Sequence, residues 1–231
     1  MSFSVSSLNL SEADLINRFN LSEYNEISGD VLAAQDNNHF SLETPRRAAV
    51  LLTLIRMPEE LGLPGWHILY TKRTNIVKHY KGQVSFPGGC SEPGDTSPEA
   101  TALREAFEEI GLQPSHVRIL GRMHRFMTMT NDLVTPVVGI IPWPYTFTLE
   151  PKEVSHVFTI PIDWIADSAH YEFRPLELPA NLHAPSQFRH AIYFKPYNDE
   201  VLWGATAEIT LHLVERLKLT CAAGQTMDCY D

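Results

Sequence analysis

The sequence has few cysteines, and the three that it contains form no recognisable pattern. Cys90, Cys221 and Cys229 show neither a paired framework nor a CxxC metal spacing, which is typical of a reducing compartment. No apolar run approaches the length needed to cross a bilayer. The first residues lack the features of a signal or transit peptide, and the last three match no common address signal. We therefore expect a cytoplasmic protein with no membrane partner.

The chain is also short of positive charge. It has 18 Lys and Arg residues against 28 Asp and Glu residues, which gives a formal net charge of -10. This balance repels a nucleic-acid backbone unless the cations gather on one face. An anionic small molecule remains possible, because a local cationic pocket or a bound metal reverses the field in one cleft. We expect a small-molecule partner rather than nucleic acid, with monomer and homodimer both open.

The length and apolar share are those of one globular domain with extensions. With 231 residues, of which 44% are hydrophobic, the chain can bury a sizeable core. We expect an N-terminal helical extension at 1–44, a main domain at 45–220 and a C-terminal tail at 221–231. Strands mixed with a few helices predict an α/β fold with a mixed sheet and helices packed on its faces.

Hydrophobic patterning predicts the strands of this fold. A continuous apolar run at 48–55 predicts a strand buried on both faces. Alternation at 66–71 predicts its hairpin partner. Further strands are expected at 117–127, 133–142 and 190–195.

Three other segments are assigned from capping, spacing and composition. Ser11 and Asp14 predict a capped amphipathic helix in the extension, and apolar spacing at 205–219 predicts a closing helix. The proline-rich stretch that follows Asp163 predicts a loop, with a lid as one use for it.

Residues 82–112 carry most of the chemical information. Ser97 suits a helix cap, Pro98 suits the first helical position, and Gly111 suits the left-handed residue that ends a helix. A helix is therefore expected at about 98–110. On a helical projection, one arc is apolar and the opposite arc is acidic, so we expect one face to pack and the other to carry carboxylates. The apolar arc holds Ala100, Leu103, Phe107 and Ile110, and the acidic arc holds Glu105, Glu108 and Glu109.

A solvated surface is the more common reason for an acidic helix face. Here the carboxylates repel by about 0.2 to 0.5 kcal/mol per pair, and Glu108 and Glu109 lie where the helix dipole also disfavours negative charge. We infer that a cation normally lies against this face, and ligands that are all oxygen select Mg²⁺ or Mn²⁺. Gly88 and Gly89 would let the backbone approach a metal or ligand closely.

Residues 104–112, REAFEEIGL, resemble the signature of the Nudix hydrolases. Gly89 and Asp95 match its upstream positions, with Asp in place of Glu and one extra residue before Arg104. The resemblance implies an α/β/α sandwich with a mixed sheet, and metal-dependent cleavage of a diphosphate bond. It also implies that Glu105, Glu109 and the Gly89 carbonyl hold the metal, with Glu108 as a further ligand or as the base, while Arg104 orients a glutamate.

The general base is left open between two residues. Glu108 is either a metal ligand or the group that deprotonates a water molecule. Glu153, in a later loop that could close over the site, is the second candidate.

Residues 69–89 resemble the corresponding element of the coenzyme A diphosphatase subfamily, although Tyr70, Thr74 and Lys78 depart from its pattern. This resemblance implies cleavage of coenzyme A or acyl-coenzyme A to 3',5'-ADP and 4'-phosphopantetheine. Arg73, Lys78 and Lys81 are the candidate phosphate-binding residues, with Gly88 as a backbone contact to substrate. An ordinary basic hairpin edge is the other interpretation, and His79 is more simply a structural or rim histidine.

Two rival functions remain. One is a Nudix hydrolase for ADP-ribose or a nucleotide sugar. The other is a Nudix-fold module that senses a nucleotide without cutting it, which the retention of Glu105, Glu108 and Glu109 argues against.

Overall fold

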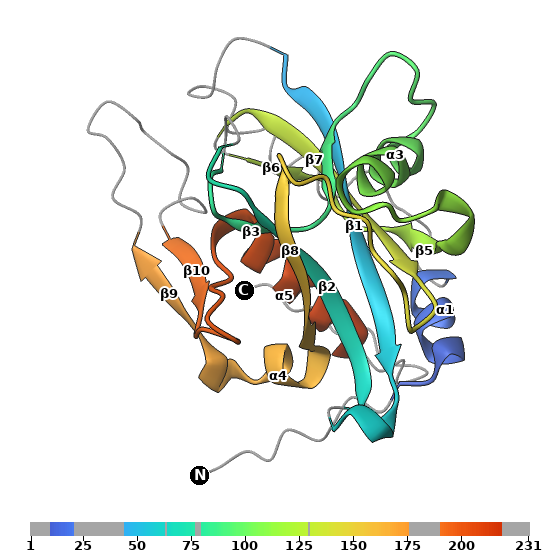
Figure 1. Cartoon of the computed structure of the whole chain (residues 1–231). Coiled ribbons are helices and arrows are strands. Elements are labelled where there is room, and N and C mark those ends of the chain that lie inside the picture. The colour runs from blue at the N-terminus through green and yellow to red at the C-terminus, as the bar shows by residue number, and fades with distance from the viewer. Residues whose placement is uncertain are drawn as a thin grey trace.

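The computed structural model describes residues 10–20, 44–62, 64–76, 80–128, 130–175 and 190–218 (Figure 1). Lys78, His79, most of the proline-rich stretch and the C-terminal tail lie outside these ranges. Within them, no helix has both the length and the apolar character needed to cross a bilayer.

Eight strands form one mixed sheet with the order β3-β2-β1-β7-β5, in which β4 pairs with β1, β6 with β7 and β8 with β2. The central pair β1 and β7 is parallel, and the other pairs are antiparallel. The strands are β1 (Arg46–Met57), β2 (Gly65–Arg73), β3 (Val84–Ser85), β4 (Gly88–Cys90), β5 (Arg118–Arg122), β6 (Phe126–Met127), β7 (Asp132–Ile140) and β8 (Val154–Pro161).

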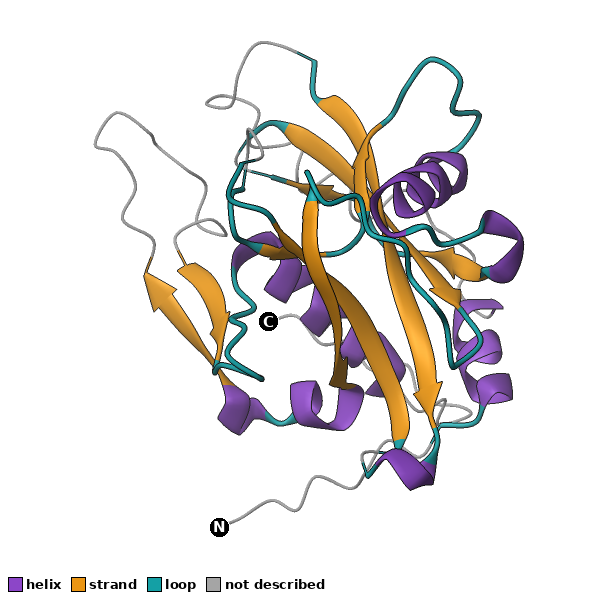
Figure 2. Cartoon of the chain, viewed as in Figure 1, coloured by secondary structure: helices purple, strands orange, loops and turns teal. Residues whose placement is uncertain are grey.

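A small second sheet and several helices complete the described structure (Figure 2). The second sheet pairs β9 (Tyr171–Pro175) with β10 (His190–Phe194) in antiparallel fashion. The helices are α1 (Glu12–Asn20), α3 (Pro98–Ile110), α4 (Ile162–Ala166) and α5 (Gly204–Lys218), with 3-10 turns η1 (Glu59–Leu61), η2 (Pro114–His116) and η3 (Ser168–His170).

The central strands are buried on both faces, because alternate side chains of a strand enter two separate cores. On one face, Leu52 and Tyr70 join side chains of α1, α4 and α5. On the other face, Leu51 and Leu69 join Ala106 and its neighbours on α3. Helices therefore cover both sides of a mixed sheet, and the predicted α/β/α sandwich is confirmed.

The N-terminal helix belongs to the same packed body. Ser11 and Asp14 cap it reciprocally, since the Asp14 N–H donates to the Ser11 hydroxyl at 3.1 Å and the Ser11 N–H donates to the Asp14 carboxylate at 2.8 Å. Leu15 and Phe19 then enter the core beneath α5. The predicted capped helix is confirmed, while the domain boundaries at 44 and 220 stay predictions.

Most of the expected strands and the closing helix are found, with two differences. The strand expected at 117–127 is two strands, β5 and β6, separated by a break at 123–125. The loop expected after Asp163 is wrong in the described part, where α4, η3 and β9 follow one another. The proline content was a poor guide here, because Pro175 is the last residue of β9, an edge strand in which proline is tolerated.

Candidate functional site

Helix α3 begins and ends as its sequence predicts. Ser97 caps it, with the side-chain oxygen accepting from the Ala100 N–H at 3.2 Å. Gly111 ends it at φ 67°, and its N–H donates to the Phe107 carbonyl at 2.9 Å. These local signals place the acidic residues of the signature in the second half of one helix.

The predicted packing face of α3 is confirmed at Ile110, which is buried, and at Leu103, which packs against the core. It is wrong at Phe107, and the acidic face is wrong at Glu109. The Phe107 side chain is 46% exposed, whereas Glu109 is only 2% exposed and packs inward with Ala102 and Ala106. The helical projection gave the large Phe107 more weight than Ala102 and Ala106 when it assigned the packing face. Small side chains pack inward here because they let the helix approach the sheet closely. Glu105 and Glu109 therefore face the protein, while Glu108, with a side chain 56% exposed, faces solvent.

The glycine pair lies in strand β4, which pairs with the N-terminal part of β1. Gly89 lies opposite Ala49 and Gly88 lies opposite Val50. A β-carbon on Gly88 would lie 2.4 Å from the Ala49 carbonyl oxygen, and one on Gly89 would lie 2.5 Å from Oε1 of Glu105. Glycine at 89 thus lets the Glu105 carboxylate rest directly against the backbone.

Arg104 organises one side of the acidic cluster, which we define as Glu105, Glu108 and Glu109. Its Nη1 donates to Glu105 at 3.0 Å and to Glu108 at 3.1 Å. Its Nη2 donates at 3.0 Å both to the Cys90 carbonyl and to Asp95, and Nε also reaches Asp95. The guanidinium holds the pKa of Asp95 at about 2, so Asp95 stays ionised and fixes the arginine in turn.

Arg73 contacts the other side of the cluster. Its Nη1 lies 3.2 Å from Oε1 of Glu109, and the Gly88 N–H donates to Oε2 of the same carboxylate at 3.2 Å. Burial raises the pKa of Glu109 to about 8, although Arg73 and the Gly88 N–H partly oppose the shift. Glu109 is therefore a buried carboxyl whose negative charge is incompletely compensated.

Glu153 approaches the same carboxylates from a separate loop. Burial raises the pKa of Glu105, and the negative charges of Glu108 and Glu153 raise it further. The Glu153 charge acts on Glu109 in the same direction. The loop is tied in place by backbone hydrogen bonds from Glu150 to Glu109 at 2.9 Å and from Thr74 to Glu153 at 2.9 Å. Four carboxylates thus influence one another in one region.

This donor set fits a hard divalent cation. The side chains are carboxylates close to a glycine backbone, and burial leaves Glu105 and Glu109 short of compensating positive charge. Arg104 and Arg73 are the cations that now contact them. Within the described ranges, no three His, Cys, Asp or Glu side chains already converge as a metal site. The carboxylates would therefore have to turn from the arginines to hold a metal ion.

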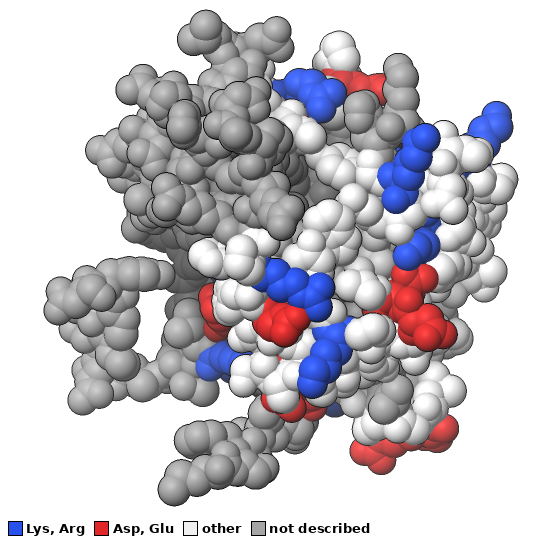
Figure 3. All heavy atoms as spheres, turned by 90° about the vertical axis from the view of Figure 1, so that its left-hand side faces the viewer, with Lys and Arg blue, Asp and Glu red and all other residues white. Residues whose placement is uncertain are grey.

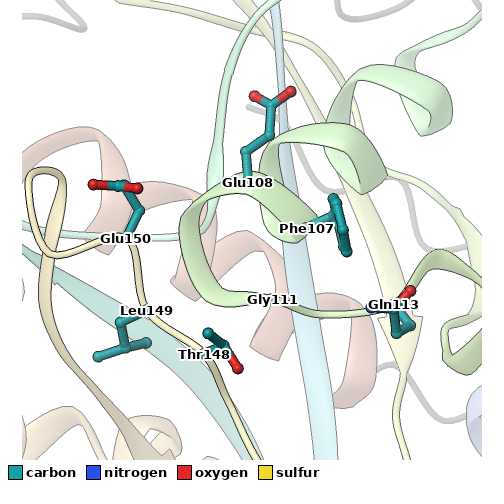
Figure 4. A pocket seen from close by; sticks show the side chains of 7 residues that line it. All are labelled: Phe107, Glu108, Gly111, Gln113, Thr148, Leu149 and Glu150. Atoms are coloured by element: carbon teal, nitrogen blue, oxygen red, sulfur yellow. The ribbon is translucent and has the colours of Figure 1, made fainter.

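A cavity of about 340 Å³ adjoins the exposed end of the cluster (Figure 4). It lies beside Gly111 and is lined by residues from the last turn of α3 and from the loop at 148–150. Phe107 and Leu149 give it an apolar part, while Glu108 and Glu150 make it acidic. Two carboxylates disfavour an anionic group there in the absence of a bound cation.

The remaining predicted substrate residues are only partly placed. Lys81 is exposed in the loop that connects Arg73 to β3, and Lys78 of the same loop lies outside the described residues. On the face drawn in Figure 3, the basic and acidic side chains of the described residues are interspersed. Arg73 is brought to the acidic cluster, whereas a shared phosphate site for the three cations stays a prediction.

The sequence interpretation missed a second polar cluster beside this loop. The Tyr80 hydroxyl is hydrogen bonded to Thr130, which donates to Asp132 at 2.7 Å. Tyr80 and Thr130 are 50 residues apart, so no local spacing links them. The left-handed backbone of Tyr80, with φ 56°, could not be predicted from the sequence either, because glycine and asparagine are the residues that usually adopt it.

Comparison with known proteins gives relatives over most of the chain. A NUDIX domain model matches residues 45–179. An uncharacterized Nudix hydrolase, NudL of Yersinia pestis (strain Pestoides F), is 33% identical over 211 residues, which cover 90% of this chain and 95% of that protein. NudL of Yersinia pseudotuberculosis serotype O:1b (strain IP 31758) gives the same values.

Among solved structures, similar folds are found at low sequence identity. The Nudix hydrolase RenU from M. Smegmatis has a TM-score of 0.43 at 20% identity, covering 53% of this chain and 74% of that one. The NUDIX domain of Shewanella oneidensis NrtR, complexed with ADP ribose, has a TM-score of 0.39 at 18% identity, covering 58% and 83%. The domain match and the NudL relatives, together with an acidic helix packed on a Gly-Gly strand, show that this chain belongs to the Nudix hydrolase family.

Proposed function

We propose that this Nudix hydrolase cleaves the diphosphate bond of coenzyme A or an acyl-coenzyme A. The products would be 3',5'-ADP and the corresponding 4'-phosphopantetheine. The observation that carries the proposal is the contact of Arg73 with Glu109, because it puts one of the three candidate phosphate-binding cations beside the acidic cluster. A substrate with a third phosphate needs a cation for that phosphate in addition to the site that holds the diphosphate.

The acidic cluster supplies the chemistry in this proposal. Glu105 and Glu109, with the Gly89 carbonyl, would hold Mg²⁺ or Mn²⁺, and Glu108 would complete the set or accept a proton from the attacking water. When bound, the metal lowers the pKa of that water and neutralises charge on the phosphates. Glu153 is the alternative base, since its negative charge acts on both Glu105 and Glu109 from a separate loop.

Arg104 is a positioning residue in this scheme. It contacts Glu105, Glu108 and Asp95 at once, so it fixes the side chains of the cluster relative to the helix. Arg73, Lys78 and Lys81 bind substrate phosphates, and the Gly88 backbone lies at the same edge. A cytoplasmic location, and a monomer or homodimer without nucleic-acid or membrane partners, stay predictions.

The experiment that tests this proposal is product identification over a panel of diphosphates. Purified protein with Mg²⁺ or Mn²⁺ is given coenzyme A, acetyl-coenzyme A, ADP-ribose and a nucleotide sugar, and products are identified by mass spectrometry. We expect kcat/KM to be highest for a coenzyme A substrate. A clear preference for ADP-ribose would replace the substrate and keep the Nudix chemistry, whereas no turnover of any diphosphate would favour a nucleotide-sensing module.

Gly89→Ala tests the contact between the glycine strand and Glu105. The new β-carbon would overlap the end of a flexible side chain, so we expect the fold to survive and the carboxylate to be displaced. Turnover should fall about tenfold, while the melting temperature changes by no more than about 2 °C.

Gly94→Ala is the matched control, because its β-carbon would meet nothing within 4 Å. It should retain wild-type turnover. Gly88→Ala should behave differently from both, since its β-carbon would overlap the backbone of Ala49 and destabilise the protein. Wild-type turnover in Gly89→Ala would contradict the proposed role of Glu105.

A further inference from the structure

Tyr80 is an aromatic side chain held at the surface by an unusual backbone. Its side chain is among the exposed large hydrophobic groups of the described residues, at 44% exposure. Its φ of 56° lies in the left-handed region, which costs free energy for a bulky residue. Strained residues of this kind persist where the surrounding structure over-determines them, and they concentrate at binding and catalytic sites.

The strain is maintained by a hydrogen-bonded chain that ends in a largely buried carboxylate. The Tyr80 hydroxyl bonds to Thr130, and Thr130 donates to Asp132 at 2.7 Å. Asp132 is 8% exposed and pairs with Arg46 at 2.7 Å. One end of the tyrosine is therefore fixed, although its ring remains open to solvent.

The loop that carries Tyr80 begins and ends next to the acidic cluster. Its first residues follow Arg73, which contacts Glu109, and it returns through β3 to Gly88, which contacts the same carboxylate. Hydrogen bonds from Gln83 to Tyr80 at 3.1 Å and from Arg73 to Gln83 at 2.9 Å close the loop. The backbone of Tyr80 is therefore linked through Gln83 to Arg73, the residue that contacts Glu109.

We propose that the ring of Tyr80 is a stacking platform for the nucleobase of the substrate, and that Thr130 positions it. The proposal rests on the proposed function, since it requires a nucleoside-containing substrate. A nucleobase offers a flat π-face, and stacking on an aromatic side chain recognises it without base-specific hydrogen bonds. Fixing the ring through its hydroxyl lowers the entropic cost of binding.

The test compares two ligands that differ only by the base. AMP and ribose 5-phosphate contain no diphosphate bond, so their dissociation constants can be measured calorimetrically on the full chain with Mg²⁺ present. Wild-type protein should bind AMP more tightly than ribose 5-phosphate. Tyr80→Ala should weaken AMP binding about tenfold and leave ribose 5-phosphate within about twofold.

Two further variants separate stacking from general damage. Tyr80→Phe keeps the ring and loses the bond to Thr130, so its loss in AMP affinity should be smaller than that of Tyr80→Ala. Phe173→Ala removes a similarly exposed aromatic side chain, 64% exposed, from β9, and should bind AMP as the wild type does (Figure 1).

The outcome is independent of the hydrolysis assays. Unchanged AMP affinity in Tyr80→Ala, or equal losses for both ligands, would overturn the stacking role. So would a wild-type protein that binds AMP no more tightly than ribose 5-phosphate, even if it hydrolyses diphosphates. Failure of the proposed function would instead appear in the diphosphate panel, as absent turnover or as a preference for ADP-ribose, with the difference between AMP and ribose 5-phosphate intact.

Discussion

Glu105→Gln and Glu109→Gln should each lower kcat/KM by at least about a hundredfold in the presence of saturating Mg²⁺ or Mn²⁺. Each change removes one negative charge from the group that would hold the metal ion. It keeps the size of the side chain, so hydrogen bonds from Arg104 to residue 105 and from Gly88 to residue 109 can persist. Activity and metal binding are measured together, by turnover and by calorimetric titration with Mn²⁺.

Glu99→Gln on the same helix is the matched control. Its carboxylate pairs with Arg122 at 2.5 Å and lies in the first turn of α3, outside the acidic cluster. It should retain turnover within about twofold, because a partly exposed ion pair contributes only about 1 kcal/mol or less to stability. Near-wild-type turnover in a folded Glu105→Gln or Glu109→Gln protein would mean that the reaction takes place elsewhere.

Arg73→Ala should lower kcat/KM for coenzyme A by roughly tenfold to a hundredfold. A charge-assisted phosphate contact contributes about 1.5 to 3 kcal/mol, and each 1.4 kcal/mol corresponds to a factor of ten. The structure adds a second effect, because Arg73 also contacts the buried Glu109. Loss of the guanidinium therefore disturbs the acidic cluster whatever substrate is present.

Dephospho-coenzyme A separates the two effects, since it lacks only the 3'-phosphate. The loss that both substrates share reports the contact with Glu109, and the additional loss with coenzyme A reports the 3'-phosphate. We expect that additional loss to be about tenfold. Equal losses on the two substrates would remove Arg73 from the 3'-phosphate site. Lys81→Ala, measured with the same two substrates, then shows whether this exposed lysine binds the 3'-phosphate instead.

The amino-acid sequence by itself determined the features that depend on neighbouring residues. Ser97, Pro98 and Gly111 set the two ends of α3, because helix caps are satisfied within one turn. The run at 48–55 predicted a strand buried on both faces, because a strand whose alternate side chains enter two cores needs apolar residues at successive positions. The sequence likewise identified the three residues of the acidic cluster, because all of them belong to one helix.

Only the tertiary structure decided how these parts face one another. Phe107 and Glu109 exchanged the environments expected from hydrophobicity, because the close approach of α3 to the glycine strand favours alanine on the inner face. Arg73 meets Glu109 across 36 residues of sequence, and Tyr80 meets Thr130 across 50. Such contacts follow from the order of strands in the sheet and from the loops that join them, and no local pattern encodes which distant side chains that order brings together.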